Sequence, residues 1–170
     1  MSRSITLFSS ARRHGNTGAL IDLVAAQSDM EVIDLDQLNM SPFDYEHKNS
    51  GDDFLPLMEK LLSFDNIIFA SPVYWYSVSP AMKIFLDRIS DLLTFPELLN
   101  MGRALRGKSG FLVSTSVNHE LSPIYVDAFV KTFGYLGMSY GGALHLNCEQ
   151  ELDLESNQDE IGKFSSIIKN

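Results

Sequence analysis

Cysteine is nearly absent from this sequence, in which Cys148 is the single example. One thiol cannot form an internal disulfide, and it is too few for a Cys-based zinc site or a chain-encoded iron–sulfur cluster. A low-molecular-weight phosphatase is excluded as well, because its phosphate loop needs a nucleophilic cysteine after the first strand. We therefore expect no metal centre.

Positive charge and long hydrophobic runs are also scarce. The chain has 13 Lys and Arg against 22 Asp and Glu, and its formal net charge is −9. This charge removes the phosphate-backbone attraction on which nucleic-acid binding depends. No run approaches the roughly 20 apolar residues of a membrane span, and the N-terminus lacks an apolar signal segment. We expect a cytoplasmic protein that binds no nucleic acid and spans no membrane.

Glycine and proline never concentrate enough to divide the chain, and no repeat is visible. We expect a single domain over residues 1–170. Apolar runs that alternate with helical patterns predict five strands and five helices. This alternation is typical of a parallel sheet with helices on both faces, and the length favours the doubly wound strand order 2-1-3-4-5. The predicted strands lie at 5–8, 30–35, 66–70, 110–114 and 138–146.

Serine and proline pairs predict where helices begin. Ser79-Pro80 and Ser122-Pro123 each offer a capping hydroxyl followed by a proline suited to the first helical position, and Ser156 could cap the last helix. Gly137 is expected to end a helix in the left-handed conformation. The expected buried faces are Met82, Phe85, Ile89 and Leu92 or Leu93 in one helix, Val126, Phe129, Val130, Phe133 and Leu136 in the next, and Ile161, Phe164 and Ile168 in the last.

Other segments carry less regular patterns. Residues 36–52 show no period, and 95–108 read as a connector. Gly141-Gly142 predicts a bulge or a close approach within the fifth strand.

Ligands of doubly wound sheets bind at the carboxyl ends of the strands, where loops 9–17, 71–79 and 115–121 are expected to meet. The first loop has hydroxyl and amide donors, a glycine that permits close approach, and the N-terminus of the following helix, all suited to a phosphate. It lacks the Gly-Lys-Ser/Thr of a Walker A loop and the Gly-x-Gly-x-x-Gly dinucleotide fingerprint. The alternative is an ordinary polar turn with a good cap.

The second loop carries three consecutive aromatics, Tyr74, Trp75 and Tyr76. Rings at a loop tip have little core to fill, so they would either pack on a flat ligand or cover a neighbouring loop or subunit. The third loop has small hydroxyl side chains. His119 and Glu120 follow there, either as an acid–base pair or as an ordinary surface pair.

Two motifs resemble those of the NAD(P)H-dependent FMN reductases of the flavodoxin-like superfamily. Ser-Ser-Ala-Arg-Arg-His-Gly-Asn-Thr at 9–17 is similar to that family's Gly-Ser-x-Arg-x-x-Gly-Asn-Thr loop, with Ser9 in place of the glycine. The stretch at 71–88 resembles its aromatic loop followed by a Lys-x-Phe-x-Asp-Arg helix. Leu136-Gly137-Met138 is similar to the usual entry into strand 5. The paired glycines that many members have in the third loop are missing here.

The resemblance implies a flavodoxin-like three-layer fold that binds FMN. The phosphate would lie on the first loop, the isoalloxazine along the second, and the third would border its other side. The implied cofactor-binding residues are Ser10, Arg12, Gly15, Asn16, Thr17, Pro72, Val73, Tyr74, Trp75, Tyr76, Ser114, Thr115 and Ser116.

The implied activity is electron transfer from NAD(P)H through FMN to a small-molecule acceptor such as a quinone, flavin, azo or nitro compound. The cofactor carries the redox chemistry, so no catalytic side chain is expected. A homodimer is also implied. The alternatives are a non-enzymatic FMN-binding electron carrier, for which the acidic charge is suitable, and a flavin-dependent sensor or binding module without turnover.

Overall fold

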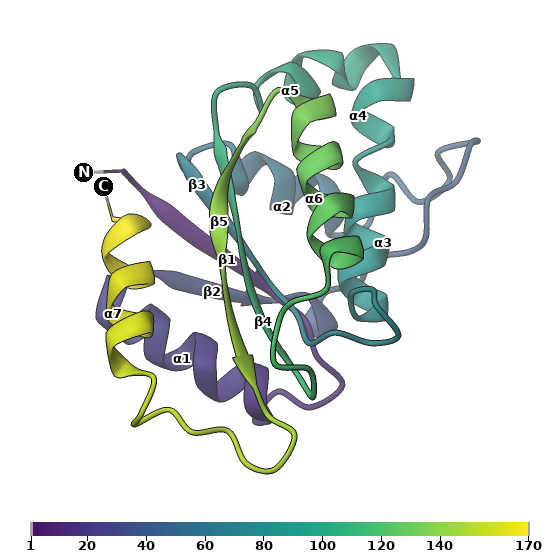
Figure 1. The fold of residues 1–170 in the computed structure, drawn as a ribbon. Coiled ribbons are helices and arrows are strands. Elements are labelled where there is room, and N and C mark those ends of the chain that lie inside the picture. The colour runs from purple at the N-terminus through teal and green to yellow at the C-terminus, as the bar shows by residue number, and fades with distance from the viewer. Residues whose placement is uncertain (1, 170) are drawn as a thin grey trace.

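Five parallel strands form the centre of the molecule. The structure is a computed structural model that describes residues 2–169. The strands lie in the order β2-β1-β3-β4-β5, and each neighbouring pair is parallel (Figure 1). The predicted fold class and strand order are therefore confirmed. The strands are β1 (Ser4–Phe8), β2 (Glu31–Asp34), β3 (Asn66–Ala70), β4 (Ser109–Ser116) and β5 (Ser139–Asn147).

Helices cover both faces of the sheet and give two apolar cores (Figure 1). On one face, α1 (Asn16–Ser28) and α7 (Gln158–Ile167) lie side by side. On the other lie α2 (Phe54–Leu61), α3 (Pro80–Arg88) and α6 (Pro123–Leu136). Aromatic rings fill much of the second core, where Phe69 and Phe133 have centroids 5.2 Å apart. Apolar burial on both faces explains why β3 reads as a continuous hydrophobic run.

The segment predicted as a plain connector is partly helical. It contains a short 3₁₀ turn (Pro96–Leu98) and α5 (Leu99–Arg103), and α4 (Asp91–Thr94) precedes them. A second 3₁₀ turn, Leu35–Gln37, follows β2. The prediction of five helices is therefore wrong, because these one-turn pieces are too short to show a period.

The helix starts agree with the predicted prolines better than with the predicted caps. Pro80 and Pro123 are the first residues of α3 and α6, but neither preceding serine makes a capping hydrogen bond with its side chain. The Ser79 hydroxyl instead donates to the Ser9 hydroxyl at 2.6 Å. The last helix begins at Gln158, so the Ser156 cap is also wrong.

The buried face of α6 differs from the predicted one at three positions, one of which is Val126, only half-buried. Val130 is 38% exposed, and Tyr125 is buried in its place. The Tyr125 hydroxyl donates to the carbonyl oxygen of Ser71 at 3.3 Å. Burial raises the pKa of Tyr125, which keeps this hydroxyl a donor. A tyrosine has both a ring for the core and a polar tip, so periodicity alone did not assign it to either side.

Two glycine predictions are confirmed. Gly137 has φ of 75° and ends α6 in the left-handed conformation. The β4–β5 register shifts between Gly110 and Phe111, where Gly141 has no paired partner. A Cβ at Gly141 would overlap the Phe111 ring, so the bulge also permits a close approach.

Arg88 binds the segment that follows β2 through Ser41 and Asp52. It is fully buried, and its Nη1 lies 2.5 Å from Asp52 Oδ2 and 3.0 Å from the Ser41 carbonyl oxygen. Its Nε lies 2.8 Å from Asp91 Oδ2. Burial alone would lower the pKa of Arg88, but the hydrogen bonds to Asp52 and Asp91 raise it. The guanidinium thus stays charged and ties residues 41 and 52 to the end of α3.

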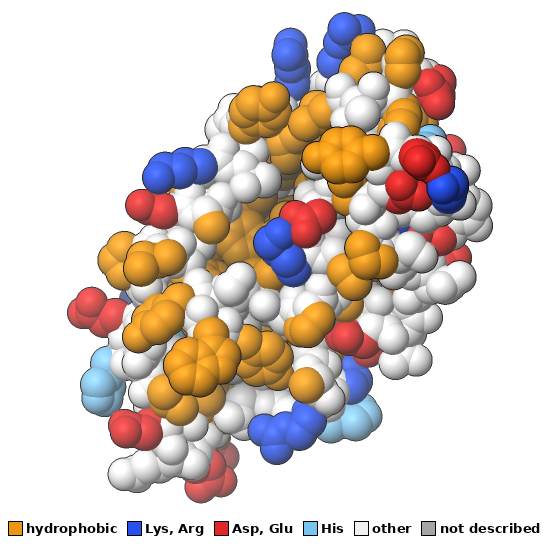
Figure 2. All heavy atoms as spheres, turned by 90° about the vertical axis from the view of Figure 1, so that its right-hand side faces the viewer, with side chains coloured by type: hydrophobic (Ala, Val, Ile, Leu, Met, Phe, Trp, Pro, Cys, Tyr) orange, Lys and Arg blue, Asp and Glu red, His pale blue; other side chains and the backbone are white. Residues whose placement is uncertain are grey.

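Hydrophobic side chains also gather on the outer face of α3 and α6 (Figure 2). A cavity of about 230 Å³ lies between these helices, lined in part by Leu86 and Phe129. Leu93 and Tyr135 are exposed on the same face. Among residues 2–169, none of the helices combines the length and apolar composition that a membrane span requires.

Candidate functional site

Three loops meet at the carboxyl edge of the sheet and enclose a cavity of about 360 Å³, which we call the three-loop cavity. This volume lies within the range of about 300–1,000 Å³ that small-molecule sites occupy. Every predicted cofactor-binding residue except Ser114 lines it. The lining residues are Ser10, Arg12, Gly15, Asn16, Thr17, Pro72, Val73, Tyr74, Trp75, Tyr76, Thr115, Ser116, Val117, Asn118 and Cys148.

The first wall is the loop between β1 and α1. Gly15, the N-cap residue of α1, has an extended backbone and, as a glycine, no side chain that could cap the first-turn N–H groups. The backbone N–H groups of Asn16, Thr17 and Gly18 donate to no acceptor among residues 2–169. Free first-turn N–H groups and the positive end of a helix form a site for an anion.

Arg12 adds the charge at this wall. Its side chain is exposed and forms no ion pair with any described residue. The neighbouring Arg13 is different, because its guanidinium is bound to Asp22 at 2.6 Å and does not line the cavity. Arg12 is therefore the cation available to an anionic ligand.

Gly18 shapes this wall, although the sequence reading did not single it out. A Cβ at this position would overlap the carbonyl oxygen of Arg13. The loop can therefore fold tightly over the start of α1 only because residue 18 has no side chain. The signal was available, since Gly18 follows directly after the motif at 9–17.

The second wall is a tight hairpin that displays two rings. Tyr74 and Ser77 exchange backbone hydrogen bonds at 2.8 and 3.0 Å. Trp75 and Tyr76 between them have φ of 50° and 63°. Positive φ at both central positions is the geometry of a type I′ turn, which normally favours Asn-Gly. Trp75 is 95% exposed, so this backbone presents the indole outward rather than packing it.

The third wall joins the first through a buried contact. The hydroxyls of Thr17 and Thr115 lie 2.7 Å apart. β4 extends to Ser116, two residues beyond the predicted strand end. Ser114 is therefore fully buried within the sheet and does not line the cavity.

His145 lies behind this wall on β5. Its Nε2 is 2.9 Å from the Ser116 hydroxyl, which also accepts the Asn118 N–H. Burial lowers the pKa of His145, which favours the neutral ring. Sequence reasoning missed this residue, because the pairing of β4 with β5 is what brings it to Ser116.

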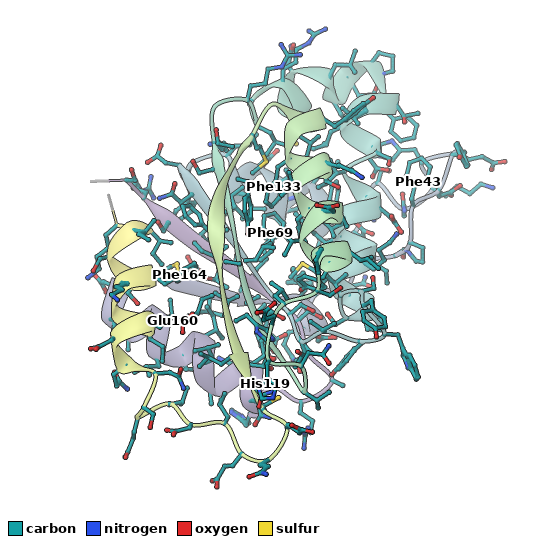
Figure 3. The ribbon with its side chains drawn as sticks, in the orientation of Figure 1. Phe43, Phe69, His119, Phe133, Glu160 and Phe164 are labelled. Carbon is teal, nitrogen blue, oxygen red and sulfur yellow. The ribbon has the colours of Figure 1, made fainter. Side chains whose placement is uncertain are left out.

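The candidate acid–base pair is not part of the cavity. His119 and Glu120 are both exposed, and neither lines it. Figure 3 shows His119 near the tips of β4 and β5, at the carboxyl end of the sheet. Among the described residues, no cluster of three or more His, Cys, Asp or Glu is arranged to hold a metal ion.

The arrangement favours a ligand with two unlike ends. Backbone donors and Arg12 suit an anion at the α1 end, and the aromatic hairpin suits a flat ring at the other. The small hydroxyl side chains of the third wall lie between them.

Comparison with known proteins is consistent with this geometry. The profile of the NADPH-dependent FMN reductase family matches residues 3–152. YwqN, an inferred NAD(P)H-dependent FMN-containing oxidoreductase of Bacillus subtilis (strain 168), is 28% identical over 166 residues, covering 93% of this chain and 92% of YwqN.

Solved structures share the fold. The Trp repressor binding protein of Bacillus subtilis superposes with a TM-score of 0.73 at 22% identity, covering 96% of this chain and 98% of that one. An FMN-dependent NADH-azoreductase of Bacillus anthracis, solved with FMN, has a TM-score of 0.72 at 12% identity, covering 99% and 100%. An NADPH-quinone reductase of P. pentosaceus has 0.69 at 19% identity, covering 100% and 99%.

Proposed function

The chain belongs to the NADPH-dependent FMN reductase family, and from this premise we propose that it binds FMN in the three-loop cavity. We propose further that it passes electrons from NADH or NADPH through FMN to a small acceptor. A quinone or an azo compound is favoured, because proteins of similar fold include a quinone reductase and an azoreductase. A free flavin or a nitro compound belongs to the same class of acceptor.

One observation carries this proposal: a single cavity has free helix N–H groups with Arg12 at one end and an aromatic hairpin at the other. FMN has a phosphate and a planar ring at its two ends, so both walls find a matching group. The phosphate would lie on Ser10, Arg12, Gly15, Asn16 and Thr17, the ring along residues 72–76, and Thr115 and Ser116 beside it.

The side chains hold and shield the cofactor. When bound, FMN supplies the exchange of electrons between nicotinamide and acceptor. The N–H groups of α1 and Arg12 offset the net charge of −9 that would otherwise repel an anion. The hairpin would border the ring of FMN, and its Trp75 and Tyr76 side chains are exposed at the mouth of the cavity. The titratable side chains that line the cavity are those of Arg12, Tyr74, Tyr76 and Cys148.

The proposal is tested with the purified chain, freed of flavin and titrated with FMN under anaerobic conditions. Saturable binding followed by rapid bleaching of the flavin band on adding NADPH or NADH is expected. Binding with slow bleaching would favour the electron carrier or the sensor instead. Absence of saturable FMN binding contradicts the proposal.

Arg12 provides the first mutational prediction. Arg12→Ala is expected to weaken FMN binding by about 1.5–3 kcal/mol, or roughly 10- to 150-fold, because a charged hydrogen bond to phosphate is lost. Binding of riboflavin, which lacks the phosphate, should be unchanged. Fluorescence titration measures both affinities.

Arg13→Ala is the matched control, because Arg13 is bound to Asp22 and lies outside the cavity. It should leave FMN affinity within about threefold of the original value. Equal losses in the two variants would mean that overall charge, not a contact from Arg12, governs binding.

We also propose a homodimer through the outer face of α3 and α6. Leu93 and Tyr135 are exposed there. Lys83 Nζ lies 2.5 Å from Asp87 Oδ1, one helical turn away. In a two-fold contact of antiparallel α3 helices, Lys83 of each copy could instead pair with Asp87 of the other. Tyr76 borders both this face and the three-loop cavity, which would set the two cavities beside the contact.

Light scattering after gel filtration tests the dimer. The unchanged chain is expected at about twice its mass of 19.0 kDa. Tyr135→Glu should shift it to the monomer, because a charge would be buried in the contact. His119→Glu, at an exposed position that lines neither hollow of this face, should remain dimeric. A monomeric unchanged chain contradicts the proposal.

A further inference from the structure

Three buried serines connect the two main walls of the cavity from behind. Ser9, Ser71 and Ser79 are all fully buried. Ser79 Oγ lies 2.6 Å from Ser9 Oγ, and Ser71 Oγ lies 3.3 Å from Ser79 Oγ. Ser9 Oγ in turn lies 2.8 Å from Asp36 Oδ2. None of these four side chains lines the three-loop cavity.

The carboxylate fixes the direction of this chain. An ionised carboxylate only accepts hydrogen bonds, so Ser9 must donate its one hydroxyl proton to Asp36. Ser9 then accepts from Ser79, and Ser79 can accept from Ser71. The Ser71 oxygen also accepts the Ser79 N–H at 2.9 Å. Asp36 is therefore the end acceptor that orients the Ser9 and Ser79 hydroxyls, while the Ser71 hydroxyl also lies 3.0 Å from the carbonyl oxygen of Pro72.

The serine hydrogen-bond chain links the first and second loops at fixed positions. Ser9 begins the loop that presents the anion-binding donors, and Asp36 Oδ2 also accepts the Ser10 N–H at 3.0 Å. Ser71 begins the aromatic loop and Ser79 ends it. Asp36, from the turn after β2, thereby holds both loops at one spacing. Ser9 takes part only through its hydroxyl, which the glycine usual in the similar motif does not have.

We propose that Asp36 is a positioning residue for the cofactor, which sets the spacing between the phosphate wall and the ring wall through Ser9 and Ser79. This inference rests on the proposed function, because spacing matters for a ligand that engages both walls at once. The affinity of a ligand that contacts only one wall should not depend on this spacing.

Charge alone gives the opposite expectation. Removing the carboxylate of Asp36 removes a negative charge beside the anion-binding loop, which would strengthen binding of an anionic ligand. Loss of positioning weakens it, because the buried Ser9 hydroxyl loses its acceptor and the loop is released. The sign of the change therefore separates the two effects.

The test compares FMN with lumiflavin, which has the ring system without the ribityl phosphate. Asp36→Ala is expected to weaken FMN binding by about 10-fold, while lumiflavin binding stays within about twofold. Asp36→Asn keeps an oxygen that can accept both hydrogen bonds and should hold FMN affinity within about threefold. Ser9→Ala, which breaks the chain inside the protein, should reproduce the Asp36→Ala result.

Asp22→Ala is the control for charge, since Asp22 pairs with Arg13 of the same loop but takes no part in the serine chain. It should not weaken FMN binding. Unchanged or tighter FMN binding in Asp36→Ala overturns the positioning role, and so do equal losses for FMN and lumiflavin. If the unchanged chain binds neither flavin, the proposed function fails instead, which distinguishes the two failures.

Discussion

Arg88→Ala is expected to lower the free energy of unfolding by about 3–5 kcal/mol, because it leaves two carboxylates without their cation inside the protein. Asp91 is fully buried, and the side chain of Asp52 is 6% exposed. The alanine also removes the donor to the Ser41 carbonyl oxygen. Urea or guanidinium unfolding, followed by circular dichroism, measures the change.

Lys60→Ala is the matched control for this prediction. Lys60 Nζ lies 2.5 Å from Glu31 Oε1, but both side chains are nearly half exposed. Exposed pairs of this kind contribute about 0.2–1 kcal/mol, so the loss should be several times smaller. A similar loss in both variants would show that burial does not set the strength of the Arg88 interactions.

Gly18→Ala is expected to weaken FMN binding by at least about 100-fold. The added Cβ would overlap the Arg13 carbonyl oxygen, so the backbone of the loop must move. That movement displaces several donors at once, including the first-turn N–H groups of α1, whereas Arg12→Ala removes only one. Fluorescence titration measures the affinity, and thermal unfolding shows whether the chain remains folded.

Gly162→Ala is the control for adding a methyl group to a helix. Gly162 lies within α7, and a Cβ there meets no heavy atom within 4 Å. This variant should bind FMN normally and gain about 0.5–1 kcal/mol of stability, since alanine loses less backbone entropy than glycine. Normal FMN affinity in Gly18→Ala would show that the tight loop is unnecessary for binding.

The sheet was predictable because its signals are local. β1, β3 and β4 are short apolar runs that each end in a polar loop, and a doubly wound topology brings those loops together. The cavity follows directly, and residues from all three loops were predicted to meet. Ser114 was misplaced because the end of a strand depends on pairing with its neighbour. β4 continues to Ser116 beside β5, which the hydrophobic pattern does not show.

Interactions between distant segments were harder to predict. Arg88 lies three residues after Phe85 and six after Met82, on the buried face of α3. That spacing was a signal for a buried charge, but its partner Asp52 comes from a segment without any period. The serine hydrogen-bond chain was also hard to predict, because it joins residues that are distant in sequence. Ser9, Asp36 and Ser79 are far apart in sequence, and only the folded chain shows their hydroxyls and carboxylate in contact.

The type I′ hairpin has a consequence for engineering. A non-glycine residue in the left-handed region costs of the order of 1–3 kcal/mol, and this turn holds Trp75 and Tyr76 there in succession. Asn-Gly at these positions would relax the backbone, so selection for heat resistance alone would drift toward it. Variants selected in this way would have a higher melting temperature but would lack the indole of Trp75 and the phenol of Tyr76. Screening for thermostable variants should therefore score flavin retention in the same round.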